Sequence, residues 1–258
     1  MRRPTLVCLL LFALGLPGCG EDPEPVAVVS RPPPFSGTIF IDPDIITSAD
    51  PTAFEGLSAA GQGSRTMFDR RVNGWITVEA YLFDASYDDG LTIEVQVNPE
   101  FASSAAALVE AEKYAEVIGR LPTTLRVDVE TVWIHMGVQP FGGGNNNLLI
   151  HIGQADLYVA DGILEETLVH EAAHTSLDAE HASSVGWRAA QSADARFIST
   201  YARDNATRED IAETFVPYLA VRYRADRISE ALANTILAAI PNRIAYLDAQ
   251  SFDMYPIE

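Results

Sequence analysis

The sequence is poor in cysteine and in basic residues, and both shortages exclude classes of protein. Only 2 of the 258 residues are cysteines, and Lys plus Arg number 17 against 36 Asp plus Glu, which gives a formal net charge of -19. A field of this sign repels phosphate backbones and anionic membrane surfaces, so we expect no nucleic-acid partner. The charge by itself identifies no substrate and no oligomeric state.

Long apolar runs are also missing, and the longest stretch lies at the N-terminus. Residues 1–18, MRRPTLVCLLLFALGLPG, place two arginines before an apolar run of about 11 residues, which is typical of a secretory signal and too short to span a bilayer. The run ends in Leu16-Pro17-Gly18-Cys19, which resembles a bacterial lipobox. We predict a lipoprotein signal peptide over residues 1–18 and lipidation of Cys19; an ordinary signal peptide cut near Gly18 or Gly20 is the alternative.

This reading predicts where the mature protein resides. It is exported to the bacterial cell envelope, on the periplasmic or cell-surface side, and touches the membrane only through its N-terminal lipid anchor. Cys8 leaves with the signal peptide, so the mature chain cannot form an internal disulfide. Residues 19–36 contain five prolines and few large apolar groups, which favours an extended linker, and residues 37–258 then form a single domain.

Apolar periodicity predicts an α+β domain with a small mixed sheet in its N-terminal half and a helical half after it. The helical half, from about Gly162, carries the candidate site. A glycine- and asparagine-rich segment, 141–147, has no partner for a helix or a ladder and is expected to be a mobile surface loop. The expected strands are 38–42, 75–83, 91–97, 131–135 and 148–152, with a hairpin turn at 88–90, and a helix is expected over 105–120.

The strongest chemical signal is a His-Glu-x-x-His pattern at His170, Glu171 and His174, within a segment of helical periodicity, 163–177. Residues four apart lie on one face of a helix, so both imidazoles can bind one Zn²⁺, and Glu171 can accept a proton from a water molecule there. Chance accounts poorly for this spacing in a chain with 5 histidines. A catalytic zinc site needs one more protein ligand.

Several downstream residues can supply that third ligand. The metzincin pattern fits poorly, because Leu177 and Glu180 stand where it requires glycine and histidine. Glu209 and Glu213 share one face of a later predicted helix. We favour Glu209, with Glu213, Glu180 or His181 as replacements.

At this point the chain resembles the gluzincins, zinc peptidases whose third ligand is a glutamate on a downstream helix. The segments Tyr-Ala-x-x-Asn and Glu-Asp-x-Ala-Glu-x-Phe, within residues 168–218, look like the C-terminal catalytic domain of anthrax lethal factor and related bacterial peptidases. The resemblance implies a zincin-like fold. It also implies that His170, His174 and Glu209 bind zinc, that Glu171 is the general base, and that Tyr201 donates a hydrogen bond to the developing oxyanion.

Other polar residues receive supporting or structural roles. Glu213, one turn from Glu209, can accept the free N–H of a ligand histidine. His135 and His151 lie in apolar strand patterns and are expected to be hydrogen-bonded structural residues. By analogy with zincins, the strand 148–152 is expected to border the cleft and to bind substrate backbone.

The pattern therefore predicts a zinc metallopeptidase that hydrolyses a peptide or protein substrate with Glu171 as general base. One alternative is a catalytically inactive zinc-binding module for surface interactions, although retention of Glu171 argues against it. Another is a hydrolase of nonpeptide bonds that uses the same metal chemistry.

Overall fold

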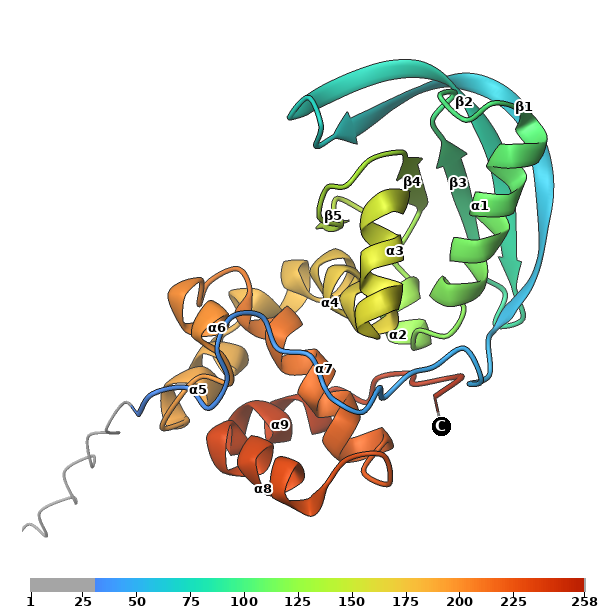
Figure 1. The fold of residues 1–258 in the computed structure, drawn as a ribbon. Coiled ribbons are helices and arrows are strands. Elements are labelled where there is room, and N and C mark those ends of the chain that lie inside the picture. Colours follow the sequence, from blue (N-terminus) through green and yellow to red (C-terminus); the bar gives the residue numbers. More distant parts are fainter. Residues whose placement is uncertain (1–30, 258) are drawn as a thin grey trace, which may run out of the picture.

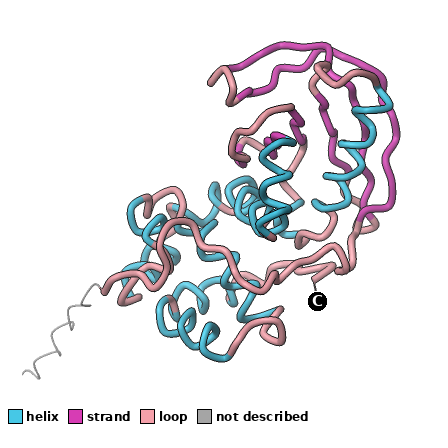
Figure 2. The backbone as a smooth tube through the Cα atoms, in the orientation of Figure 1, coloured by secondary structure: helices cyan, strands magenta, loops and turns pink. Residues whose placement is uncertain are grey.

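The computed structural model describes residues 31–257, and the predicted signal peptide, Cys19 and most of the predicted linker lie outside this range. The predicted order is confirmed: a mixed sheet forms the N-terminal half and helices follow it (Figure 2). No helix among residues 31–257 is long and apolar enough to cross a membrane. The strands are β1 (Phe54–Asp69), β2 (Gly74–Tyr87), β3 (Thr92–Val97), β4 (Thr131–His135), β5 (Gly142–Gly144) and β6 (Asn147–His151).

Nine α-helices and one π-helical turn occur within the described residues. They are α1 (Ser104–Ile118), α2 (Thr123–Arg126), α3 (Ile152–Asp161), α4 (Leu164–Ser176), the π-helical turn η1 (Asp178–Ala182), α5 (Val185–Ala193), α6 (Thr200–Asp204), α7 (Asp210–Tyr223), α8 (Glu230–Ala239) and α9 (Pro241–Asp248). The predicted strands 75–83, 91–97, 131–135 and 148–152 and the predicted helix 105–120 are confirmed within a few residues.

The six strands form one sheet in the order β1-β2-β3-β4-β6-β5. The pairs β3–β4 and β4–β6 are parallel and the others are antiparallel, so the sheet is mixed. Successive side chains of a strand point to opposite faces. On β4, Val132 and Ile134 join the main core beneath the helices, whereas Trp133 packs with a smaller cluster around Met67 and Leu82. The sheet therefore has a helix face and an opposite face.

The hairpin β1–β2 provides the cover for that opposite face. Only Tyr81–Ser86 of β2 pair with β3, and the rest of β2 pairs with β1 alone. Figure 1 shows this long hairpin arching over the sheet, with its tip above β5. The sequence prediction missed β1, because its glycine, serine and alanine residues lack an apolar alternation.

Two predictions about the sheet are wrong. The glycine-rich segment is not a free loop, since Gly142–Gly144 form β5, which pairs antiparallel with β6. The strand 148–152, expected to bind substrate backbone, is paired on both sides by β4 and β5 and so offers no free edge; β5 is the edge strand at this end of the sheet. Propensity failed here because tertiary pairing, and close packing on α4 that only glycine permits, override the weak strand preference of glycine.

The predicted strand 38–42 is also wrong, because these residues pair with no strand. Their backbone N–H groups instead meet buried carboxylates: Ile39 donates to Glu213, and Ile41 donates to Glu166. We call residues 35–47 the strap, which crosses α6 and α7 in Figure 1. The end of the predicted linker continues this attachment, since the N–H of Arg31 donates to the carbonyl of Ala195. Residues 31–36 therefore lie against the domain.

Candidate metal centre

The helix α4 carries the His-Glu-x-x-His pattern and is buried along most of its length. Two acidic residues in its first turn, Glu165 and Glu166, favour the helix because they lie at the positive end of its dipole. His170 and His174 follow one turn apart, and each is largely shielded from solvent. The contacts of α4 with α7 and β5 place these imidazoles between the helical half and the edge of the sheet.

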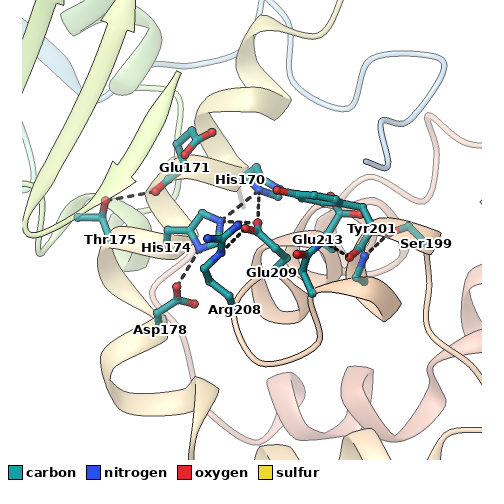
Figure 3. A network of polar contacts seen from close by, with 12 residues as sticks. His170, Glu171, His174, Thr175, Asp178, Ser199, Tyr201, Arg208, Glu209 and Glu213 are labelled. Atoms are coloured by element: carbon teal, nitrogen blue, oxygen red, sulfur yellow. Dashed lines mark hydrogen bonds and ion pairs between the residues drawn. The ribbon is translucent and has the colours of Figure 1, made fainter. Parts of the chain in front are cut away.

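Glu209, the residue directly before α7, completes a compact group with the two histidines (Figure 3). The Nε2 atoms of His170 and His174 lie 3.2 Å apart. Glu209 Oε2 is 3.0 Å from Nε2 of His174 and 3.4 Å from Nε2 of His170. Two imidazole nitrogens and one carboxylate oxygen thus converge on one point and can hold a metal ion.

The spacing of these atoms suits a small divalent cation. Donors bound to zinc at about 2.0–2.1 Å in a tetrahedral arrangement lie about 3.3 Å from one another, close to the observed separations. Three protein ligands also leave a fourth position for water or substrate, as in catalytic zinc sites. The donor set therefore fits zinc.

Carboxylates lie on the Nδ1 side of both imidazoles, and the one beside His174 is within hydrogen-bond distance of its ring. Asp178 Oδ2 lies 2.8 Å from Nδ1 of His174, and Glu213 Oε1 lies 3.6 Å from Nδ1 of His170. Ser199 Oγ and the backbone N–H of Ile39 donate to the other oxygen of Glu213. Both rings consequently turn their Nε2 atoms towards Glu209, and the strap is tied to the same site.

The other candidates for the third ligand lie elsewhere. Glu213 faces Nδ1 of His170, on the side of the ring away from the converging atoms. Glu180 is exposed to solvent. His181 is held by the Tyr246 hydroxyl, 2.8 Å from its Nδ1 atom. The geometry therefore favours Glu209 among the four residues that the sequence left open.

The three converging residues line a cleft of about 670 Å³, together with Glu171 and Tyr201. Among the contacts drawn in Figure 3, Glu171 takes part only through its backbone carbonyl, which accepts from Thr175. As a residue, Glu171 is part of the lining of this cleft. Tyr201 lies on α6, and Arg208 reaches Glu209 Oε1 with its Nε atom at 2.8 Å.

The charges of the site favour a bound cation. Although burial opposes the charged form, hydrogen bonds with Asp178 and Glu209 raise the pKa of His174 to about 10. Burial opposes ionisation of Glu209 as well, but the two histidines hold its pKa below the usual range. Burial and the negative charge of Glu209 raise the pKa of Tyr201. The same carboxylates that stabilise a proton on His174 would stabilise a metal ion.

Sequence reasoning missed Asp178, Ser199 and Arg208. A signal for Asp178 was present, because it follows His174 by four residues and so continues the ligand face of the helix. Ser199 and Arg208 gave no comparable signal, since each reaches the site through the turns around α6.

His135 and His151 lie outside the site, at the ends of β4 and β6, with their rings stacked at 5.3 Å. Both side chains are fully buried. His135 Nδ1 lies 3.0 Å from the Asn98 amide, and His151 Nδ1 lies 2.9 Å from the carbonyl of Met136. This placement agrees with the predicted structural role.

No protein-family model, no curated protein and no solved structure matches this chain.

Proposed function

We propose that this chain is a zinc peptidase with a zincin-like fold, in which His170, His174 and Glu209 bind the metal. The observation that carries the proposal is the convergence of two Nε2 atoms and one carboxylate oxygen beside Glu171, in a cleft. A purely structural zinc site favours four protein ligands, whereas three ligands and an adjacent carboxylate are typical of hydrolytic sites.

Zinc, when bound, acidifies a water molecule and polarises a carbonyl group. Glu171 accepts the proton of that water and returns it to the departing amine, which restores the carboxylate for the next cycle. Tyr201 donates a hydrogen bond to the oxygen on which negative charge develops. Asp178 and Glu213 keep the Nε2 atoms of the two histidines available by occupying the Nδ1 side of each ring.

The first test is the zinc content of the purified protein. We expect about one zinc per chain in the wild type and a clear loss in Glu209→Ala. Glu180→Ala is the matched control, because it removes a carboxylate from an exposed position of the same region. A wild-type protein that takes up no zinc after reconstitution would rule the proposal out.

The second test separates an enzyme from a zinc-binding interaction module. We expect Glu171→Gln to keep its zinc and to lose hydrolysis of unstructured peptides. If neither the wild type nor this variant hydrolyses any peptide, while both hold zinc, the interaction module is the better description.

We also propose, from residues 1–19 alone, that the protein is exported and carries a lipid on Cys19. Metabolic labelling with a fatty-acid analogue should mark the wild type and not the Cys19→Ala variant. Label on both proteins, or on neither, contradicts the lipid anchor without affecting the zinc site.

A further inference from the structure

A second cavity, of about 270 Å³, opens beneath the tip of the β1–β2 hairpin. We call it the hairpin pocket. Phe68, Trp75, Trp133 and Leu149 form its apolar wall, and Arg70 and residues 142–145 and 147 complete it. We call the cleft lined by His170, His174 and Glu209 the metal cleft. It shares Arg70, Gly143 and Gly144 with the hairpin pocket, so the two cavities adjoin each other along β5.

The wall of the hairpin pocket is aromatic and partly open to solvent. The ring of Trp75 lies 5.5 Å from the ring of Phe68 and 5.5 Å from the ring of Trp133, in edge-to-face arrangements. Trp75 nevertheless remains 60% exposed. A large apolar surface that stays in water beside a cleft is typical of a binding site for an apolar group.

The backbone of β5 runs between the two cavities, which lie on opposite faces of the sheet. A Cβ atom added to Gly143 would lie 1.8 Å from the carbonyl oxygen of Glu171, on the helix face. A Cβ atom added to Gly142 would instead lie 2.9 Å from Arg70 Nη2, on the side of the hairpin tip. Neighbouring positions along this edge therefore face α4 and the hairpin pocket alternately.

The hairpin tip is held in place by an ion-pair network. Arg71 pairs with Asp69 at 2.7 Å and with Glu100 at 2.6 Å, and Glu100 also accepts the backbone N–H of Met136. Glu100 follows β3, so this network ties the tip to the body of the sheet. The aromatic wall is thus fixed over β5 before any ligand arrives, which lowers the entropic cost of binding.

We propose that the hairpin pocket is a substrate subsite that takes an aromatic or large aliphatic side chain of an extended peptide. The peptide lies along β5, with one side chain in the hairpin pocket and the two adjacent side chains directed to α4. This inference rests on the proposed peptidase function, because the substrate is a peptide that the metal cleft also receives. The subsite defines the chemical class of one substrate residue, which lies at a constant distance from the cleaved bond.

The test uses zinc-loaded protein and mixtures of amidated octapeptides in which one position is fixed as Phe or as Ala and the others vary. Hydrolysis is followed by mass spectrometry, and binding is followed by fluorescence anisotropy of the same mixtures with an N-terminal label. We expect the wild type to prefer Phe over Ala by about tenfold or more, at one fixed distance from the cleaved bond. Trp75→Ala should reduce the preference for Phe over Ala to about twofold or less.

Two variants keep the comparison specific. Val72→Ala shortens another exposed apolar side chain of the same hairpin tip, which lines neither cavity, and should keep the preference. Trp75→Phe retains an aromatic wall and should restore most of it. Because Trp75 is largely exposed, its replacement is expected to leave the fold intact.

The outcomes separate this inference from the proposed function. Hydrolysis with equal use of Phe and Ala, or with a preference that Trp75→Ala leaves unchanged, overturns the subsite and leaves the peptidase standing. Binding of Phe mixtures that depends on Trp75, without hydrolysis, supports the subsite and contradicts the peptidase. A wild type that binds no peptide mixture overturns the subsite.

Discussion

Asp178 is the residue whose part in the proposed metal site is most directly measurable. Its Oδ2 atom lies 2.8 Å from Nδ1 of His174, on the side of the ring away from Glu209. A carboxylate there fixes the tautomer that leaves Nε2 free and makes the ring a better donor to a metal. We expect Asp178→Asn to lower zinc affinity by about 10- to 100-fold, measured by competition with a chelating indicator.

Glu180→Gln is the control for this prediction. It removes the same charge two residues away, at an exposed position of η1. Zinc affinity should stay close to that of the wild type. An equal loss in both variants would show that net charge, and not the orientation of His174, sets the affinity.

Gly143, on the edge strand β5, packs directly against the backbone of α4. A methyl group at this position would meet the backbone oxygen of Glu171 at 1.8 Å, and that oxygen cannot move without α4. We expect Gly143→Ala to lower the free energy of unfolding by about 1–3 kcal/mol, as overpacking does, measured by urea denaturation.

The neighbouring glycine offers a matched comparison. A methyl group at Gly142 would be tight only against the far end of the flexible Arg70 side chain, at 2.9 Å, and would lie at ordinary contact distance, 3.6 Å, from Leu149 Cβ. Gly142→Ala should therefore cost less stability than Gly143→Ala. The close packing of β5 on α4 would be contradicted by equal stabilities of the two variants.

Among the elements, α7 is the one whose start carries the proposed third ligand, and a buried ion-pair cluster fixes that start. Arg243, on α9, pairs with Asp210 at 2.8 Å and with Asp194 at 3.0 Å, and all three side chains are buried. Asp210 directly follows Glu209. The cluster therefore joins α9 and the end of α5 to the first turn of α7, where the proposed ligand lies.

Removal of the Arg243 guanidinium should destabilise the fold, because it leaves the buried carboxylates of Asp194 and Asp210 without a cationic partner. We expect Arg243→Ala to lower the free energy of unfolding by about 3–5 kcal/mol in urea denaturation. Arg222→Ala provides the contrast, since its pair with Asp248 is partly exposed and should contribute about 0–1 kcal/mol. Similar losses in the two variants would mean that burial does not govern these pairs.

The stacked histidines at the ends of β4 and β6 make the stability of the whole domain depend on pH. Burial lowers the pKa of His135 from 6.5 to about 4. The unfolded chain therefore takes up a proton first as the pH falls, and the folded state loses stability between about pH 6.5 and pH 4. Above and below this window His135 contributes no further change.

A comparison with His135→Gln isolates this contribution. Other titrating groups are common to both proteins, so their effects largely cancel in the difference between the two free energies of unfolding. The free energy of unfolding of the wild type minus that of His135→Gln should fall by up to about 3 kcal/mol between pH 7 and pH 4. Stability curves that run parallel over this range would contradict a buried neutral His135.

Features that depend on local spacing could be predicted from the sequence. A period of 3.6 residues placed His170 and His174 on one helix face. Alternation identified β3, and short apolar runs identified β2, β4 and β6. The acid-rich composition and the order of sheet before helices also followed from the sequence. These properties need no knowledge of which distant segments meet.

Features that depend on contacts between distant segments could not be predicted in this way, because the sequence does not say which segments meet. The sequence favoured Glu209 but left Glu213, Glu180 and His181 open, and the packing of α7 on α4 is what brings the Glu209 carboxylate to the Nε2 side of both rings. A glycine tract became the edge strand because β6 and α4 offer it a partner and a surface that no side chain would fit. The strap failed to form a strand because two buried carboxylates, 125 and 174 residues away along the chain, accept its N–H groups.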